Sequence, residues 1–203
     1  MNIYADGEFL VGVSADTLIR FGLRKGDDIS SATLRAIERA EELLGARTAA
    51  MRLLGVRPRS VREIRDALRE KEFPDDIAAE TIAALGEAGL LDDAAFARTF
   101  VRNALALRPS GSILLKRKLL LLGVDKAVAE EAVGEILGGV DQAGAAAHAA
   151  EKFLARRRRS EADGARLRRQ VVQFLLRRGY TWDVAREATR RALKGDGGEG
   201  EEL

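Results

Sequence analysis

The sequence predicts an all-α protein of three tandem three-helix repeats, built as helix-turn-helix-like units and preceded by a small β-hairpin and helix. The first observation is an apolar pattern that occurs three times, centred on Phe73, Val124 and Tyr180, which lie 51 and then 56 residues apart. A repeat of this length with helical spacing is typical of stacked helical units. The other two observations are an apolar content of 46% and only 3 prolines, which permit long helices with ordered cores.

The same pattern predicts which side chains are buried in each repeat. Apolar residues recur nine and five positions before each centre and four positions after it. This spacing places them on one face of consecutive helices, so we expect them to form the repeat cores. The three sets are Ile64, Leu115 and Val171; Leu68, Leu119 and Leu175; and Ile77, Val128 and Val184.

The first 47 residues differ from the rest and are expected to form an extension. Residues 3–5 and 8–13 read as short strands around Asp6-Gly7, a pair suited to the positive φ angles of a two-residue turn. Residues 14–21 predict a short helix, and helical periodicity begins at Ser31 and runs to Leu44. Because a two-stranded hairpin is marginal by itself, we expect it to lean on the first helix of the array.

Start and stop signals divide the remainder into three helices per repeat. In the first repeat, we expect a helix from Thr48 to Gly55, and then a capping box formed by Ser60 and Glu63. Asp75 and Asp76 are expected in the first turn of the third helix, where carboxylates favour the helix dipole. The expected divisions of the chain are the extension 1–47, repeats 48–91, 92–142 and 143–194, and a disordered acidic tail 195–203.

In the second repeat we expect a first helix from the Asp92-Asp93 pair, a break at Pro109-Ser110-Gly111, a second helix ending at Gly123 and a third capped by Asp125. In the third repeat the expected helices begin near residues 143, 165 and 182, and Thr181 is the expected N-cap of the last one. Tyr180 and Trp182 lie beside arginines, and such an aromatic pair could stack on bases. Tyr180 is instead expected in the core because it aligns with Phe73 and Val124, whereas the exposure of Trp182 is left open.

The charge distribution indicates the kind of partner. The net charge is only +2, but residues 143–194 carry 14 basic and 5 acidic residues. A module this basic is expected to meet nucleic acid or an acidic protein surface. Cysteine is absent, which fits a reducing cytosol. The chain contains neither an apolar stretch long enough to span a membrane nor a signal-peptide pattern, so we expect a cytoplasmic protein without membrane contact.

The residues needed for most enzyme chemistry are missing. The glycine-rich segment 195–200 is followed by acids rather than Gly-Lys-Ser/Thr, so it cannot act as a phosphate-binding loop. The single His148 excludes multi-histidine metal sites and a serine–histidine–aspartate triad. The Asp pairs 27/28, 75/76 and 92/93 are explained by helix starts and turns. We therefore expect no catalytic residues, cofactor or metal, and a protein that is not an enzyme.

Clustered basic residues are the candidate binding site. Between residues 156 and 178 there are 9 bases and 2 acids, whereas salt-bridged helical faces normally alternate in sign. A solvated face remains the alternative. Smaller sets on the equivalent helices of the other repeats suggest a basic strip, with Arg62 and Arg65 in the first repeat. The candidate contacts to DNA or a protein are Arg156, Arg157, Arg158, Arg159, Arg166, Arg168, Arg169, Arg177, Arg178, Lys116, Arg117 and Lys118.

Several motifs resemble the RecX family of recombinase regulators. One segment, Leu91-Asp92-Asp93-Ala94-Ala95-Phe96-Ala97, is similar to the family signature. The residues that match the signature are Leu91, Asp92, Asp93, Phe96 and Ala97. The turn Arg178-Gly179-Tyr180 resembles the family's Arg-Gly-Phe element in its third unit. The opening hairpin, with Gly22-Leu23 and Gly26 to Ile29, is similar to the extension of longer members. The turn 108–111 departs from the usual Gly-Pro order.

The resemblance implies a non-enzymatic regulator in DNA repair, homologous recombination and the SOS response. Family members bind the RecA recombinase, chiefly its nucleoprotein filament, and restrain its ATPase, strand exchange and coprotease activities; some bind single- or double-stranded DNA. We expect a monomer whose repeats bridge neighbouring recombinase protomers. One alternative is a sequence-specific DNA-binding regulator, which would need Asn, Gln or Arg aimed at base edges. The other is a protein-only adaptor, favoured if the arginines are salt-bridged.

Overall fold

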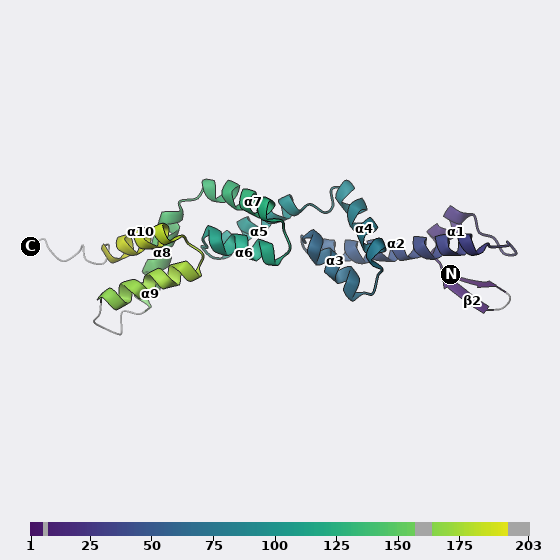
Figure 1. Ribbon diagram of the computed structural model, residues 1–203, viewed down its shortest axis with the longest axis horizontal. Coiled ribbons are helices and arrows are strands. Elements are labelled where there is room, and N and C mark those ends of the chain that lie inside the picture. Colours follow the sequence, from purple (N-terminus) through teal and green to yellow (C-terminus); the bar gives the residue numbers. More distant parts are fainter. Residues whose placement is uncertain (6–7, 157–163, 195–203) are drawn as a thin grey trace, which may run out of the picture. The chain divides into compact units, whose positions relative to one another are not determined.

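The computed structural model describes residues 1–5, 8–156 and 164–194, and within them the chain forms a two-stranded hairpin followed by ten helices (Figure 1). The predicted turn at Asp6-Gly7, the arginines 157–159 and the acidic tail lie outside the described residues. The chain divides into two compact units, residues 1–92 and the residues from 93 onward. The all-α repeat architecture with a small β element, predicted from the sequence, is confirmed.

The two short strands and the short helix at the start of the extension form where the sequence predicted them. Strand β1 (Asn2–Ala5) pairs antiparallel with β2 (Glu8–Gly12), with a bulge between Ile3 and Tyr4. The rings of Tyr4 and Phe9 meet edge to face at 5.9 Å between centroids. Helix α1 (Ala15–Phe21) follows, and the Ser14 side chain caps it by accepting from the Thr17 amide. A cross-strand aromatic pair and a capped helix are the local interactions that stabilise such a short segment.

The support for this extension comes from helix α2 (Ser31–Val56). The Ser14 amide and hydroxyl both donate to Oε1 of Glu41, at 2.7 and 2.9 Å. Burial opposes ionisation of Glu41, but hydrogen bonds from Thr17 and Ser14 outweigh it and lower the pKa of this carboxyl. The start of α1 is thereby fixed to the middle of α2.

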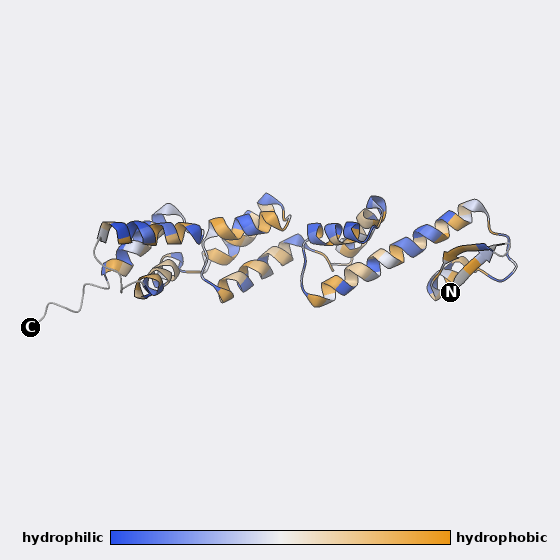
Figure 2. Cartoon of the chain, turned by 90° about the horizontal axis from the view of Figure 1, so that it is seen from below, coloured by the Kyte–Doolittle hydropathy of each residue, from blue (hydrophilic) through white to orange (hydrophobic). Residues whose placement is uncertain are grey.

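One sequence-based expectation about α2 is wrong. We expected separate helices over residues 31–44 and from Thr48 to Gly55, whereas α2 is a single helix of 26 residues. Gly45 does not end the helix but lies against the ring of Phe73, where a Cβ would be 3.3 Å from Cε1. The glycine therefore makes room for a packed aromatic ring rather than a break. Figure 2 shows apolar residues gathering at the carboxyl end of this long helix.

The carboxyl half of α2 forms the first repeat with α3 (Val61–Glu70) and α4 (Asp75–Glu87). The capping box at the start of α3 is present in both directions: Ser60 Oγ accepts from the Glu63 amide, and Glu63 accepts from the Ser60 amide. Asp75 and Asp76 occupy the first turn of α4, as predicted. The core of this repeat comprises Ala46, Ala50, Ile64, Leu68, Ile77, Ala78, Leu85 and Leu91.

The second repeat consists of α5 (Asp93–Leu107), α6 (Ser112–Leu121) and α7 (Lys126–Gly138). Asp125 caps α7 through a 2.7 Å hydrogen bond from the Ala127 amide, which confirms the predicted N-cap. Its core comprises Phe96, Ala97, Val101, Leu115, Leu119, Val124, Ala129, Ala132 and Val133.

The third repeat consists of α8 (Gln142–Ala155), α9 (Gly164–Arg177) and α10 (Trp182–Lys194). Alanines of α8 and α10 pack closely, and Val171, Leu175 and Tyr180 complete the core. Tyr180 is 1% exposed, as the repeat alignment predicted, whereas Trp182 is 55% exposed. The exposure of Trp182, which the sequence left open, is therefore high: its side chain lies largely in solvent.

The repeat pattern correctly predicts the innermost positions. Ile64, Leu115 and Val171 and their partners five positions before each centre are all fully buried. The outer positions are less uniform, because Phe73, Val128 and Val184 are only partly buried. Each repeat therefore uses the same inner layer, while burial varies at the outer positions.

Two glycines join the second and third repeats. The amide of Gly111 donates to the carbonyl of Arg178 at 2.9 Å, and the amide of Ile113 donates to the carbonyl of Gly179 at 3.0 Å. A Cβ on Gly111 would lie 2.1 Å from the Gly179 oxygen, and one on Gly179 would lie 2.3 Å from the Leu114 amide nitrogen. Gly179 also has a φ of +81°, which L side chains rarely adopt. Only glycine permits this approach of two backbones.

Replacing Leu119 with Ala should destabilise the protein by about 2–5 kcal/mol, the usual cost of emptying a core leucine site. Leu121 lies on the same helix but is 72% exposed. Leu121→Ala should therefore change the free energy of unfolding by less than about 0.5 kcal/mol. Chemical denaturation of both variants measures the difference, and equal effects would show that the assignment of buried positions is wrong.

Replacing Gly111 with Ala should loosen the joint between the second and third repeats. The added Cβ would meet the Gly179 backbone, so we expect a loss of about 1–3 kcal/mol, as for other overpacked sites. Gly134 in α7 is the matched control because a Cβ there would meet nothing within 4 Å. Gly134→Ala should instead stabilise by about 0.5–1 kcal/mol. Thermal unfolding should show a lower melting temperature for Gly111→Ala and a higher one for Gly134→Ala. An unchanged melting temperature for Gly111→Ala would contradict the proposed joint.

Candidate functional site

Basic residues of α9 form an exposed stripe along one face of the helix. Arg166, Arg169, Gln173 and Arg177 follow one another at spacings of three or four residues, which places them on a single face. All four side chains are exposed, while Val171 and Leu175 point into the core. We call these four residues the α9 stripe.

The α9 stripe differs from the other basic helices in its ion pairing. None of its three arginines makes an ion pair with the part of the chain that the structure describes. In the first repeat, by contrast, most arginines near α3 are paired. The pairs are Arg57–Glu63 at 2.5 Å, Arg62–Asp66 at 3.6 Å, Arg69–Asp75 at 2.7 Å, and Arg39 with both Asp76 and Glu80. The positive charge of the first repeat is largely compensated locally, and that of α9 is not.

The second repeat is intermediate. Lys116 lies 3.9 Å from Glu130 of α7, whereas Arg117 and Lys118 are exposed. The outer surface of α6 also carries exposed Ile113, Leu120 and Leu121. The predicted basic strip therefore differs between the repeats in how many of its basic residues are ion-paired and in how many apolar residues are exposed beside them.

A basic pocket of about 300 Å³ lies where the turn between α5 and α6 meets the third repeat. Arg108 and Pro109 come from this turn, and Phe174 comes from α9. The other lining residues are His148, Ala149, Lys152, Phe153, Arg156 and Arg178. The pocket thus brings four arginine and lysine side chains together, with no carboxylate among the residues that line it.

Arg178 is held at the centre of this basic pocket. Its guanidinium lies 4.6 Å from the centroid of the Phe174 ring, which itself stacks on Phe153 at 4.4 Å. Its Nη1 donates to the carbonyl of Pro109 at 3.3 Å. Its Nε is buried and has no hydrogen-bond acceptor among the described residues. Cation–π stacking and one backbone contact therefore orient the group.

Like charges surround the Arg178 guanidinium in the basic pocket. Burial lowers the pKa of Arg178, and the neighbouring positive charges of Arg108 and Arg156 lower it further. The guanidinium remains charged because its ordinary pKa is so high. Glu151 lies 3.7 Å from the lining residue His148 in an exposed pair. An anion in the pocket would relieve this repulsion.

The structure brings together only some of the residues that the sequence indicated. Arg156 and Arg178 share the basic pocket, and Arg166, Arg169 and Arg177 share the α9 stripe. Arg168 lies apart, in a groove with Asp183 and Glu187 of α10. Arg157, Arg158 and Arg159 lie outside the described residues. Arg108, His148 and Lys152 also line the pocket but were not among the contacts predicted from the sequence. For Arg108, the available sequence signal was its position directly before the Pro109 break.

The residues of the family signature have structural roles. Leu91 is buried in the core of the first repeat, and Phe96 and Ala97 are buried in the core of the second. Asp93 is the first residue of α5, with a carboxylate at the favourable end of the helix dipole. The signature therefore marks the start of the second repeat, and Asp92 is its exposed member.

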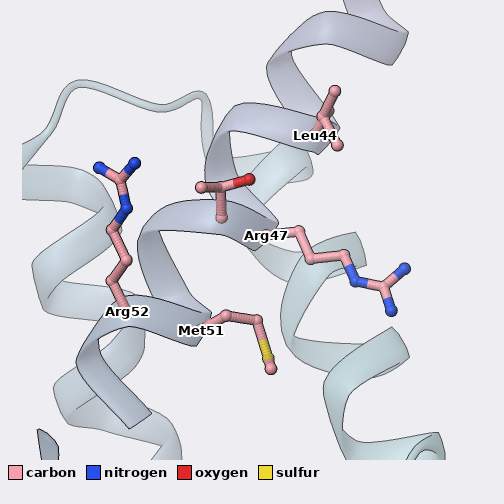
Figure 3. A pocket seen from close by; sticks show the side chains of 5 residues that line it. Leu44, Arg47, Met51 and Arg52 are labelled. Carbon is pink, nitrogen blue, oxygen red and sulfur yellow. The ribbon is translucent and has the colours of Figure 1, made fainter. Parts of the chain in front are cut away.

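Other features of the described residues offer little for chemistry. A shallow pocket on α2 is lined by Leu44, Arg47, Thr48, Met51 and Arg52, and Figure 3 shows Arg47 and Arg52 extending away from each other. No group of three or more histidine or acidic side chains that could hold a metal ion occurs in the described ranges. Among the helices that the structure describes, none combines the length and apolar character needed to cross a membrane.

Comparison with known protein families gives four matches along the chain. The model of the regulatory protein RecX N-terminal domain matches residues 1–30. The models of the first, second and third three-helix domains of RecX match residues 46–85, 92–133 and 141–189. The four matches follow one another in order and cover the extension and all three repeats.

Individual relatives agree with this assignment. The chain is 26% identical to the regulatory protein RecX of Clostridium botulinum strain Eklund 17B, over 95% of the chain and 90% of the relative. It is 29% identical to the regulatory protein RecX of Bacillus licheniformis, over 100% of the chain and 77% of the relative. It is 35% identical to that of Lactobacillus delbrueckii subsp. bulgaricus strain ATCC 11842, over 66% of the chain and 50% of the relative.

Solved structures show the same fold. A crystal structure of a regulatory protein RecX superposes with a TM-score of 0.75 at 26% identity, covering 90% of this chain and 89% of the other. RecX from Lactobacillus salivarius superposes with a TM-score of 0.68 at 24% identity, covering 76% of this chain and 99% of the other. The order of the four matching domains and the shared fold lead to one conclusion: the chain belongs to the RecX family of regulatory proteins.

Proposed function

We propose that this protein binds a RecA-type recombinase, chiefly its nucleoprotein filament, and restrains its ATPase, strand exchange and coprotease activities. Membership of a family of regulatory proteins supports this proposal. The observation that carries the DNA-binding part is the α9 stripe, whose three exposed arginines have no ion pair with the described residues. Unpaired cations along one helix are suited to a polyanion such as a DNA strand.

The two alternative functions receive less support. A protein-only adaptor was favoured if the arginines were salt-bridged, and that pairing occurs in the first repeat but not in the α9 stripe. A sequence-specific regulator needs side chains that hydrogen-bond to base edges in a groove. The α9 stripe offers three arginines and the single amide of Gln173, so phosphate contacts are the better match. We propose a non-enzymatic, cytoplasmic protein that acts as a monomer.

Titration of the protein into a recombinase ATPase assay on single-stranded DNA tests the regulatory role. We expect the rate of ATP hydrolysis to fall and to level off as the protein saturates the filament. The control is an excess of the same single-stranded DNA, because a protein that only sequestered DNA would lose its effect. An unchanged rate at saturating protein, or full recovery with excess DNA, would contradict filament binding.

The salt dependence of binding to single-stranded DNA tests the α9 stripe. With roughly four to six phosphate contacts, a plot of log affinity against log salt should have a slope of about −3 to −4. Replacing Arg166, Arg169 and Arg177 together with Ser should make the slope shallower by about 2.

The matched control for this experiment also removes three arginines. Arg39, Arg62 and Arg69 are each paired with a carboxylate, so replacing them with Ser should leave the slope close to that of the parent protein. Equal losses in the two triple variants would show that net charge alone determines binding. Strong discrimination between unrelated duplexes would instead support the sequence-specific alternative.

A further inference from the structure

We propose that the basic pocket around Arg178 binds a backbone phosphate group of a single DNA strand. This inference rests on the DNA-binding part of the proposed function and names the place and the chemistry of one contact. The pocket is defined by Arg108, Lys152, Arg156 and Arg178, with Phe153 and Phe174 beside them.

Charge is the first argument for an anionic ligand. The four cationic side chains come from the α5–α6 turn, from α8 and its end, and from the residue that follows α9. Four cations line the same pocket without a carboxylate between them. Such a group is stabilised by an anion with several oxygen acceptors, and a phosphate group provides them.

The fixed position of Arg178 is the second argument. Stacking on Phe174 and the hydrogen bond to Pro109 hold the guanidinium in one place before any ligand arrives. A group that is already ordered loses less conformational entropy on binding. A planar guanidinium also matches the geometry of a phosphate better than a lysine ammonium does.

The shape of the pocket and its surroundings favour a polymer over a free ion. Pro109, Ala149 and the two phenylalanines give the pocket an apolar side, which suits a sugar or a base next to the phosphate. Phe174 and Arg178 directly follow Gln173 and Arg177 of the α9 stripe in the sequence. The stripe extends for about 16 Å along the helix. A DNA strand can occupy the pocket and the stripe together, whereas a mononucleotide cannot.

The test is fluorescence anisotropy of the full-length protein with a labelled single strand of 20 thymidines. Arg178→Ala should weaken binding about tenfold or more, the size expected for a charge-assisted hydrogen-bonded contact. Arg178→Lys keeps the charge but loses the planar group, so its binding should remain weakened. The matched control is Arg102→Ala, which removes one exposed charge from α5 outside the pocket and should change affinity by less than about twofold.

A second variant keeps the test decisive if Arg178→Ala fails to fold. Lys152 is exposed on α8 and does not belong to the core, so Lys152→Ala should fold normally. It should weaken binding and reduce the salt slope by about 0.7. The pocket assignment would be overturned if Lys152→Ala and the folded Arg178 variants bound the strand as tightly as Arg102→Ala does. DNA binding itself would then still stand.

Competition identifies the source of the phosphate. An unlabelled 20-mer should displace the labelled strand, whereas thymidine monophosphate at the same phosphate concentration should not. Equal displacement by the mononucleotide, or by polyglutamate at the same charge concentration, would overturn the assignment to DNA. If the parent protein binds no single strand at all, the DNA-binding part of the proposed function fails with the pocket, and the ATPase titration then decides the regulatory part by itself.

Discussion

The contact between Gly111 and Gly179 is the constraint on which the surface of the second unit depends. Two backbone hydrogen bonds join Gly111 and Ile113, at the start of α6, to the carbonyls of Arg178 and Gly179 after α9, and a Cβ on either glycine would clash with the other segment. This contact brings Arg108 and Pro109 next to Phe174 and Arg178. The basic pocket therefore exists only when the second and third repeats are packed against each other. A binding feature built this way depends on folding of both repeats.

Each residue of the Arg178-Gly179-Tyr180 turn contributes something different. Tyr180 fills the core of the third repeat, Gly179 allows the close approach to Leu114, and Arg178 points its charge toward the pocket. Gly179 adopts the left-handed conformation that commonly ends a helix, so the chain turns there between Arg178 and Tyr180. One short turn thereby links core packing, repeat packing and surface chemistry.

The three repeats share an inner layer but differ in surface chemistry. Fully buried aliphatic side chains at equivalent positions support the same three-helix arrangement in each. The outward faces are under no such constraint. The first repeat pairs most of its arginines near α3 with carboxylates, and the second combines bases with exposed leucines. In the third, Arg190 and Arg191 pair with Glu187, whereas the α9 stripe makes no ion pair with the described residues. Repeat proteins can vary their binding surfaces in this way because the cores do not depend on them.

The sequence by itself determined the repeat architecture, the buried inner positions, the capping residues Ser60, Glu63 and Asp125, and the basic character of the third repeat. These follow from local periodicity and composition, which act within one helix or turn. Tertiary structure decided the rest: α2 is one helix in which Gly45 lies against the ring of Phe73, Arg108 and Lys152 join Arg178, and Arg168 lies in a different groove. These outcomes depend on which segments distant in sequence come into contact, and helical spacing carries no information about such contacts.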